Sequence, residues 1–600
     1  MKTKNILKYI AASLIAILMS SCEDFLTQVN PNEITTDSYW RNLSDTKGGL
    51  TSVYNAFRDM DVMGTRFEIP RSDASYPGWG RPNTTNEYYL QIFTASTDGA
   101  NKKWEKIYLG IFRANQVIFG LEGIKDNMVS EDELLDWQYQ MGQARFFRGL
   151  FYHYLNSSYN NGDVILYDFL PQSEEDFNQP LTPSSKIKEF LRADLEFAKE
   201  NLPASWTDYA GPGEESSEGS PVNNINLGRV TSGAATAVLG KSYLFENDYQ
   251  TAATYFKEII DSGVYRLMDN INDNFTAKNE FNQESILEIG YNLNTKVDEG
   301  GGSQQGTTNT YPNLYSNIGG FRSLYPANWL ILAYRNDAPD PSDARNHVGV
   351  DEFDAPIVRK FSLRTSYSIA LIDDEDCEPY YGNEIMADIN AFKNGESAYW
   401  KKMTNWETVS SENDIFDKSG INYRVIRYAE ILLMYAECLL EGGSNEGGVQ
   451  AALDIINQVR YRSAVILLGE SAKGQYASST YDENIYSSTD VMEHLMHKER
   501  PMELSGEGYS IRQIDLRRWG ITKERFEYLA AKKYYLDIYK WVNGEGKNKS
   551  KRGIMTEGED PTYTGTDLTE FTQAAINYRE RDHAYWPIPV EETTANSEIN

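Results

Sequence analysis

One uninterrupted helical pattern organises this chain: Asn422-Tyr-Arg-Val-Ile-Arg-Tyr-Ala-Glu-Ile-Leu-Leu-Met-Tyr-Ala-Glu-Cys-Leu-Leu-Glu441. Its apolar residues recur at helical spacing and extend round most of the cylinder, which is typical of a helix buried on several sides. We therefore predict one helix over 422–441, ended by Gly442-Gly443. A second helix is predicted over Val449–Arg462. Two antiparallel helices joined by a short loop form one unit of a helical repeat.

An earlier segment repeats this plan. Leu239-Gly240-x-x-Tyr243, followed by Ala252-x-x-x-Phe256, matches the spacing of the tetratricopeptide pattern. The tryptophan and the closing proline of that pattern are missing, with Thr236 and Val264 in their places. The segment is interpreted as a tetratricopeptide-like pair, with an ordinary helical hairpin as the alternative.

The composition limits the partners. The 600 residues carry 57 Lys+Arg and 88 Asp+Glu, a formal net charge of −31. Such a surface repels phosphate backbones, so no nucleic-acid partner is expected. The 41 tyrosines and 11 tryptophans supply rigid rings with polar tips, most of them expected in the core. The composition therefore leaves neutral ligands open.

The N-terminal sequence is typical of a lipoprotein signal peptide. Basic residues precede an apolar run, Tyr9–Met19, that is too short to span a bilayer. The run ends in Leu18-Met-Ser-Ser-Cys22, where small residues stand directly before a cysteine. We predict a signal peptide over 1–21, lipidation of Cys22 and a linker over 22–36. The alternative is a secretory signal with an incidental cysteine.

The rest of the chain is expected to form a single domain over 37–600. Helical signals at Trp104–Leu121, Glu131–Leu155 and Ser184–Asn201 support a helical scaffold, which resumes at 421 and continues through Thr489–Trp519. The rhythm is weak between these parts, where glycine, asparagine, serine and tyrosine abound and short strands are expected. The predicted parts are scaffold over 37–268 and 421–530, an irregular ligand-facing region over 269–420 and a tail over 531–600.

These pieces, in this order, resemble the SusD/RagB family of outer-membrane nutrient-binding lipoproteins over the whole mature chain. The one clear departure is a slightly longer segment between Gly508 and Asp515. The resemblance rests on Cys22-Glu-Asp-Phe-Leu26, Tyr39-Trp40, Tyr108-x-Gly110-Ile-x-Arg113-Ala-Asn115, Ala144-Arg145-x-x-Arg148, Gly162-Asp163-Val164, Tyr423-Arg424-x-x-Arg427-Tyr-Ala-Glu430, Asn457-x-Val459-Arg-x-Arg462, Glu499-Arg500-x-x-Glu503-Leu504, Asp515-Leu-Arg-Arg-Trp519-Gly520 and Trp586-Pro-Ile-Pro589.

The resemblance implies a mainly α fold, a tetratricopeptide-like helix-pair scaffold with a loop-rich region carrying short strands. It also implies a lipid-anchored protein, exposed at the cell surface on the outer membrane. Such a protein binds glycan, or in some branches peptide, and delivers it to a TonB-dependent transporter of the SusC type. Members of the family are not enzymes, and no cofactor is expected.

Glycan binding needs flat apolar faces and bidentate polar side chains. Trp79 lies between two glycines and near two prolines, so it is predicted to stack on a sugar ring while Asp73 and Asn83 bind hydroxyls. The alternative is that Trp79 folds back as a plug. The candidate ligand-binding residues, chosen by region and residue type, are Arg66, Asp73, Trp79, Asn83, Tyr291, Tyr311, Tyr315, Tyr325 and Arg359.

Several other functions remain as alternatives. A glycoside hydrolase needs two placed carboxylates, and no local motif singles out a pair. His494-x-x-His497 with Glu499 is better interpreted as a polar helix face than as a metal site, and Asp373–Asp376 as a solvated loop than as a calcium site. A pure scaffold protein is a further alternative, and a disulfide between Cys377 and Cys438 is left open.

Replacing the predicted lipidated residue tests the anchor. Because the lipid would be the attachment, Cys22→Ala should move the protein from the membrane fraction to the soluble fraction, measured by cell fractionation and immunoblotting. A variant that stays fully membrane-bound contradicts the lipoprotein interpretation.

Overall fold

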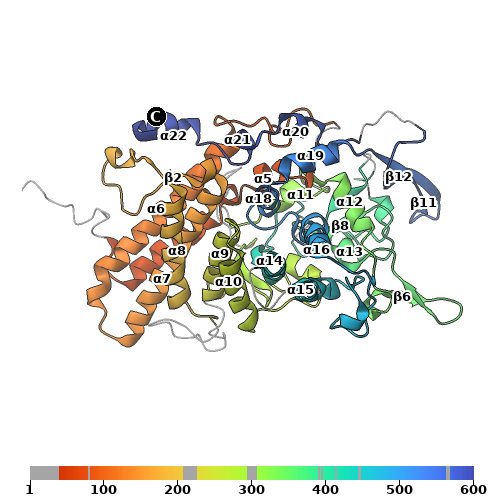
Figure 1. The fold of residues 1–600 in the computed structure, drawn as a ribbon, viewed down its shortest axis with the longest axis horizontal. Coiled ribbons are helices and arrows are strands. Elements are labelled where there is room, and N and C mark those ends of the chain that lie inside the picture. The colour runs from red at the N-terminus through yellow and green to blue at the C-terminus, as the bar shows by residue number, and fades with distance from the viewer. Residues whose placement is uncertain are drawn as a thin grey trace, which may run out of the picture.

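Helices dominate the computed structural model, as the sequence predicts. It describes residues 39–78, 82–206, 226–293, 307–389, 392, 396–412, 415–442, 448–562 and 568–599. Helices fill one half of the molecule, and a region of short strands and loops fills the other (Figure 1). In the part of the chain that the structure describes, no helix is both long and apolar enough to cross a bilayer.

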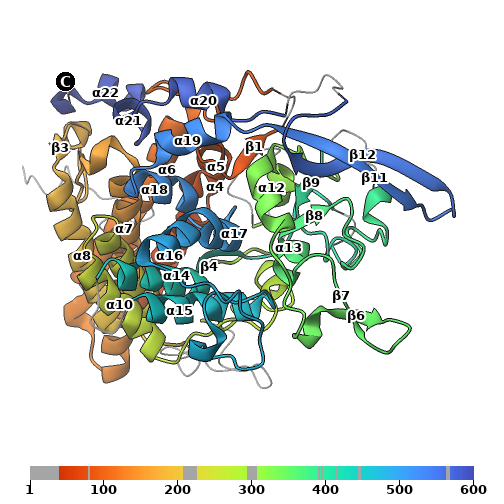
Figure 2. The ribbon, with the colours of Figure 1, turned by 45° about the vertical axis from the view of Figure 1, so that its right-hand side comes forward.

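The helical half is a series of antiparallel helices in which each packs on the next (Figures 1 and 2). Helix α7 begins with a capping box between Ser130 and Glu133, which satisfies free amides of its first turn. The series runs α3 (Leu43–Phe57), α6 (Asp98–Ile124), α7 (Glu131–Ser158), α8 (Ser184–Asn201), α9 (Ser232–Leu244), α10 (Tyr249–Asp261), α14 (Tyr428–Leu440) and α15 (Val449–Arg462).

The tetratricopeptide-like pair is α9 and α10, and its glycine has a packing reason. A Cβ atom at Gly240 would lie 2.5 Å from the ring of Phe256, so the helices approach this closely only because Gly240 has no side chain. Both residues belong to the spacing that predicts the pair. The prediction of a helical hairpin here is confirmed.

The stretch 422–441 is not one helix, and that prediction is corrected. Its first part is a strand, β10 (Tyr423–Arg427), paired antiparallel with β4 (Ser285–Ile289), and helix α14 starts only at Tyr428. β-Branched Val425 and Ile426 suit a strand, and the partner that selects the strand lies far away in sequence. The predicted burial is confirmed, because every residue of α14 from Tyr428 to Leu439 is buried.

The predicted helical region 489–519 is broken into pieces. Helix α16 (Ser488–His494) passes through a π-helical turn, Leu495–Glu499, into α17 (Arg500–Leu504). Pro501 has no N–H to continue the helical hydrogen bonds, and the carbonyl of Met496, five residues before it, instead accepts a 2.6 Å hydrogen bond from Arg512. Helix α18 (Ile511–Arg518) follows after Ser510, whose φ of 52° is left-handed.

The strands of the described residues form six two-stranded sheets. The β11–β12 hairpin lies in the region predicted only as a tail, although Asn543-Gly544 between two strand-like runs is a hairpin signal. It projects from the body together with β6–β7 (Figures 1 and 2). Besides β4–β10, the pairs are β1 (Ser75–Pro77) with β5 (Leu324–Pro326), β2 (Val164–Ile165) with β3 (Leu181–Thr182), β6 (His347–Val350) with β7 (Pro356–Val358), β8 (Ile369–Leu371) with β9 (Ala398–Trp400), and β11 (Tyr534–Val542) with β12 (Asn548–Glu557).

Short helices connect the two halves and cover one side of them. The last four lie along the top of Figure 1. All of these short helices are, in chain order, α4 (Met60–Met63), α5 (Thr65–Arg71), α11 (Tyr311–Tyr315), α12 (Asn328–Arg335), α13 (Leu363–Ser368), α19 (Thr522–Ala530), α20 (Thr572–Asn577), α21 (Glu580–His583) and α22 (Val590–Ala595).

The C-terminal segment is held to the first helices through one carboxylate. Glu68 of α5 accepts hydrogen bonds from Arg71 at 2.8 Å and from the indole of Trp586 at 2.7 Å, and it pairs with Lys103 of α6. Trp586 is fully buried, and the Arg71 guanidinium lies 4.1 Å from its ring centre. The first and last parts of the described chain therefore share one buried polar cluster.

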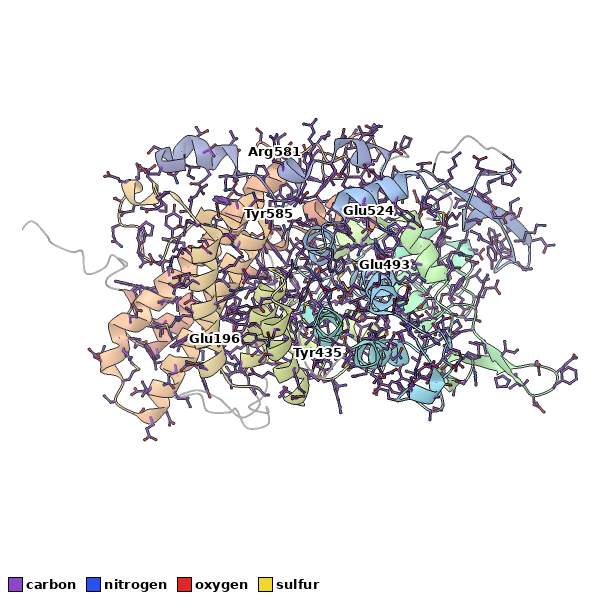
Figure 3. The ribbon with its side chains drawn as sticks, viewed as in Figure 1. Glu196, Tyr435, Glu493, Glu524, Arg581 and Tyr585 are labelled. Carbon is purple, nitrogen blue, oxygen red and sulfur yellow. The ribbon has the colours of Figure 1, made fainter. Side chains whose placement is uncertain are left out.

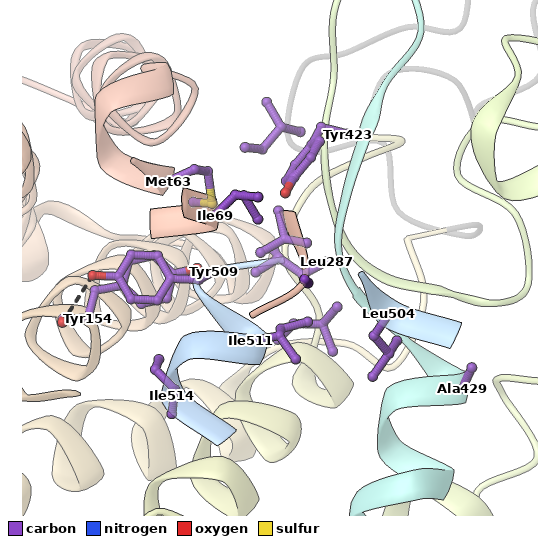
Figure 4. Packing of buried hydrophobic residues seen from close by; sticks show 14 of the residues in the cluster. Met63, Ile69, Tyr154, Leu287, Tyr423, Ala429, Leu504, Tyr509, Ile511 and Ile514 are labelled. Atoms are coloured by element: carbon purple, nitrogen blue, oxygen red, sulfur yellow. Dashed lines mark hydrogen bonds between the residues drawn. The ribbon is translucent and has the colours of Figure 1, made fainter. Parts of the chain in front are cut away.

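The two halves meet in a dense core. Tyr154 of α7 and Tyr509 stack with their ring centres 3.6 Å apart, and the Tyr509 hydroxyl donates to the Tyr154 carbonyl at 3.1 Å (Figure 4). Ala429 of α14 and Leu504 of α17 lie in the same cluster, which continues from the helices into the strand region. Cys377 and Cys438 are free thiols, so a disulfide between them is not formed.

A buried network of ion pairs, which we call the Arg427–Glu503 network, links three of the sequence motifs. Arg427 donates to Glu507 at 2.5 Å and to Glu503 at 3.1 Å, and it also pairs with Glu284. Arg462 of α15 pairs with Glu284 and Glu503. These side chains are at most 3% exposed. Because each buried charge is matched by opposite charges, the charged motifs act in the scaffold.

Protonating this network should destabilise the fold. Burial alone would raise the pKa of Glu503, but the charges of Arg462 and Arg427 lower that pKa from 4.5 to about 2. The unfolded chain therefore binds this proton more readily, so the stabilisation is complete above pH 4.5 and is lost as the pH falls toward 2. This shift corresponds to about 3 kcal/mol in the free energy of unfolding.

Glu503→Gln should lower the free energy of unfolding at pH 7 by about 3–5 kcal/mol, because it leaves buried arginines unmatched. The gap from the wild type should shrink between pH 4.5 and pH 2, as measured by denaturant titrations. Glu493→Gln, at the exposed Glu493 labelled in Figure 3, is the matched control and should stay near the wild type. A pH-independent gap argues against the ionised network.

Candidate functional site

A surface hollow of about 720 Å³ lies where two predicted ligand regions meet. Three segments line it: the first turn of α5, the loop 86–98 and the segment 314–323. We call it the rim hollow. The residues used below are Arg66, Phe67, Glu87, Asp98, Phe321 and Ser323. Its walls come from both halves of the molecule, so only the folded chain forms it.

The pairing of β1 with β5 brings these segments together. Tyr76 stands opposite Tyr325, and the ladder continues with a hydrogen bond of 2.9 Å from the Gly78 N–H to the Ser323 carbonyl. A Cβ atom at Gly78 would lie 2.0 Å from the backbone oxygen of Arg322. Glycine is therefore required for the close approach of the two chains at the edge of the hollow.

Arg66 brings a cationic donor group to the rim hollow. Its guanidinium lies 4.5 Å from the ring centre of Phe67 and 3.4 Å from Asp61, and its side chain is 37% exposed. The Nε–H of Arg66 is buried and has no protein partner. A guanidinium carries five N–H donors in one plane, so the exposed part of the Arg66 group can still bind adjacent hydroxyls of a ligand.

Phe321 supplies an apolar face that sequence reasoning missed. Its side chain is 61% exposed, although its N–H is fixed by a 2.7 Å hydrogen bond to the Asn313 carbonyl. Gly319-Gly320 before it and the left-handed φ of 54° at Arg322 after it bend the chain so that the ring projects. A bulky residue directly after paired glycines is the signal that could have identified it.

Carboxylates complete the polar lining. Glu87 accepts from the Thr97 hydroxyl at 3.4 Å, and Asp98 pairs with Lys102 at 2.6 Å. The bond to Lys102 lowers the pKa of Asp98, so this group is an acceptor at neutral pH. An acid catalyst of glycoside hydrolysis needs a raised pKa, the opposite shift. An exposed ring, a guanidinium and carboxylate acceptors together suit a ligand with an apolar face and many hydroxyls.

The other candidates of the first region hold the structure around the hollow. Asp73 is fully buried, with ion pairs to Arg512 at 2.6 Å and to Arg525 at 2.8 Å. The side-chain amide of Asn83 donates to the Gly78 carbonyl at 2.9 Å and closes the loop that contains Trp79. Trp79 itself lies outside the described residues.

The predicted tyrosines are buried. Tyr311 stacks on Tyr423 with ring centres 4.4 Å apart, and the Tyr315 hydroxyl donates to the Gly506 carbonyl at 3.3 Å. Tyr325 is 8% exposed, and the Tyr291 hydroxyl donates to the Arg58 carbonyl at 3.2 Å. None of these four tyrosines lines the rim hollow, although Leu314, Phe321 and Ser323, which lie between Tyr311 and Tyr325, do. Their ligand-binding role stays a prediction.

Arg359 lies apart from the rim hollow. It is 7% exposed, and its guanidinium donates to the Phe361 carbonyl at 2.7 Å and to the Ser366 hydroxyl at 3.0 Å. Its predicted role in ligand binding likewise stays a prediction. Of the eight candidate residues that the structure describes, Arg66 alone lines the hollow.

The acidic run proposed as an alternative calcium site is engaged by cations. Asp373 pairs with Arg335 and Lys360, each at 2.7 Å. The ring of His494 likewise lies against Glu499, which Arg460 contacts at 2.8 Å. Among the described residues, no group of three or more His, Cys, Asp or Glu side chains is placed to hold a metal ion.

Comparisons with known proteins agree with this architecture. The family model described as "SusD family" matches residues 283–600, and the one described as "Starch-binding associating with outer membrane" matches residues 24–212. SusD-like protein P25 of Formosa agariphila is 24% identical over 546 residues, covering 87% of this chain and 90% of that protein.

Solved structures share the fold. The crystal structure of a SusD homolog from Bacteroides thetaiotaomicron has a TM-score of 0.67 at 20% identity and covers 94% of this chain and 97% of its own. A laminarin-binding SusD-like protein has a TM-score of 0.59 at 20% identity, with 94% of this chain and 99% of its own covered.

Asp73→Asn separates a structural role of Asp73 from a ligand-binding role. Because it leaves Arg512 and Arg525 without their buried partner, we expect a loss of about 3–5 kcal/mol in the free energy of unfolding, measured by chemical denaturation. Asp351→Asn, at an exposed aspartate of the β6–β7 hairpin, is the control. An unchanged stability would reopen Asp73 as a ligand contact.

Proposed function

The chain belongs to the SusD family, and from that premise we propose that it binds a glycan in the rim hollow. The observation that carries the proposal is the exposed ring of Phe321 in the same hollow as the Arg66 guanidinium. A sugar presents CH groups to an aromatic face and paired hydroxyls to a bidentate donor. The laminarin-binding relative, which shares the fold, supports a glycan as the ligand class.

The proposal extends to the place and the partner of the protein. A lipid on Cys22 would tether it to the outer membrane at the cell surface, and a SusC-like TonB-dependent transporter would receive the glycan. The family model whose description names association with the outer membrane supports this location. The formal charge of −31 favours neutral glycans over acidic ones, because like charges repel.

The backbone around the hollow is ordered before a ligand binds, which favours binding through individually weak contacts. Gly78, Ser323 and Asn313 fix the backbone on both sides of it through hydrogen bonds. A sugar gains little from each contact, so a site that is already ordered loses less entropy on binding. Trp79, which lies outside the described residues, remains a predicted stacking residue in addition to Phe321.

Two truncations test the site. A panel of neutral polysaccharides first identifies the ligand by affinity gels, and calorimetry then measures the variants. Arg66→Ala should lose about 1.5–3 kcal/mol of binding, because it removes a charged donor. Phe321→Ala should lose about 1 kcal/mol. The melting temperature should change little in Phe321→Ala, because that ring is 61% exposed, and somewhat more in Arg66→Ala, because Arg66 is partly buried and contacts Asp61.

Phe353→Ala is the matched control, because Phe353 is an 80% exposed ring on the β6–β7 hairpin away from the hollow. It should bind like the wild type. Equal affinities of wild type, Arg66→Ala and Phe321→Ala would place the ligand elsewhere. Release of new reducing ends from the bound polysaccharide would replace binding by hydrolysis as the function.

A further inference from the structure

A second cavity, of about 460 Å³, lies beside α6 and has a different chemistry. One wall is the stripe of α6 that carries Trp104, Tyr108 and Phe112, and the opposite wall is the β2–β3 connection with Tyr167 and Phe177. Helix α22 closes one end, and Figures 1 and 2 show it next to these elements. We call this space the α6–α22 cavity. None of its lining residues belongs to the rim hollow.

The aromatic rings form adjoining walls at steep angles. The ring centres of Tyr108 and Tyr167 are 5.8 Å apart with planes at 85°, and those of Tyr167 and Phe177 are 6.2 Å apart at 62°. Trp104 continues the row, 4.6 Å from Tyr108 at 53°. Rings set at such angles around one space present more than one π-face to a guest, as in aromatic cages for ammonium groups.

The hydrogen-bond donors of these walls are already used. The Tyr108 hydroxyl donates to the Ile165 carbonyl at 2.8 Å, and the Tyr167 hydroxyl donates to the Phe177 carbonyl at 2.8 Å. The indole of Trp104 donates to Glu592 at 3.0 Å. A sugar, which needs donors as well as acceptors for its hydroxyls, therefore finds little to bind on the aromatic walls.

The charges that line the cavity are negative. Glu105 of α6 and Glu591 and Glu592 of α22 belong to its lining, which contains no lysine or arginine among the described residues. Lys106 contacts one oxygen of Glu105 at 3.1 Å. Burial raises the pKa of Tyr167, and the negative charge of Glu592 raises it further. The Glu592 carboxylate is therefore close enough to affect the charge of a group in the cavity wall. Aromatic faces and carboxylate acceptors complement a cation.

We propose that the α6–α22 cavity binds a small organic ammonium ion, a positively charged nitrogen carried on an apolar body. The apolar groups would contact the faces of Tyr108, Tyr167 and Phe177, and the charge would lie toward Glu105 and Glu591. The strongly acidic surface would raise the local concentration of such a cation. This site is independent of the glycan proposed for the rim hollow.

Choline and 3,3-dimethylbutan-1-ol test the proposal, because they have nearly the same shape and differ in charge. Saturation-transfer NMR with the full mature chain measures binding of each. We expect choline to bind about fivefold or more tightly than the neutral alcohol, on the scale of partly desolvated cation–π contacts. Equal binding of the two, or binding of neither, overturns the proposal.

Variants then locate the bound cation. Phe177→Ala should weaken choline binding severalfold because it removes an aromatic face, and Phe177→Tyr should restore binding because it keeps one. The fold should stay intact in both variants, because the Phe177 ring is half exposed. Glu105→Gln with Glu591→Gln should also weaken it severalfold. Glu524→Gln is the matched control, because Glu524 lies on the exposed face of α19, away from α22 (Figures 1 and 3).

The outcomes are distinct from those of the glycan experiment. Unchanged choline binding in Phe177→Ala, or equal losses in the carboxylate pair and in Glu524→Gln, means a diffuse surface effect and overturns the site. Arg66→Ala should bind choline like the wild type. A loss in Phe321→Ala would instead place the cation against the exposed ring of the rim hollow.

Discussion

Charge neutralisation inside the protein is the constraint on which this architecture depends. Arg427 stands at the junction of strand β10 and helix α14, with Glu503 from α17 and Glu284 before β4 on either side of it. A buried guanidinium without such partners would cost several kcal/mol, so these three distant segments must fold together. The network thus joins the helical half to the strand half. It also explains why Arg427, Arg462 and Glu503 line neither cavity.

A second buried cluster of charges, around Glu68, fixes the elements that carry both cavities. Glu68 holds Arg71, Lys103 and Trp586, which ties α5, α6 and the C-terminal segment into one unit. Arg66 lies two residues before Glu68, at the rim hollow, and Trp104 directly follows Lys103, in the α6–α22 cavity. The two cavities therefore share a rigid support but not their chemistry. One offers a guanidinium and an open ring, and the other offers rings and carboxylates.

Local patterns predicted the helices well, because helical hydrogen bonds and amphipathic spacing are local. Ser184–Asn201 and Val449–Arg462 begin and end as predicted, and Gly240 faces Phe256 as the tetratricopeptide spacing requires. The predictions failed where a partner distant in sequence determined the local structure. Tyr423–Arg427 became a strand because Ser285–Ile289 pairs with it. The region 489–519 is interrupted between Leu504 and Ile511, where Glu507 binds the distant Arg427 and Lys402.

By itself, the sequence determined the family and the mainly helical fold, since these depend on residue order and local periodicity. It predicted ligand regions at 66–83 and 269–420, parts of which meet at the rim hollow. Only the tertiary structure decided which side chains reach the surface there. Asp73 is neutralised by two arginines and Tyr311 is stacked in the core, whereas Phe321 projects. Exposure depends on what packs against a residue from elsewhere in the chain, and the residue's own neighbours in sequence do not carry that information.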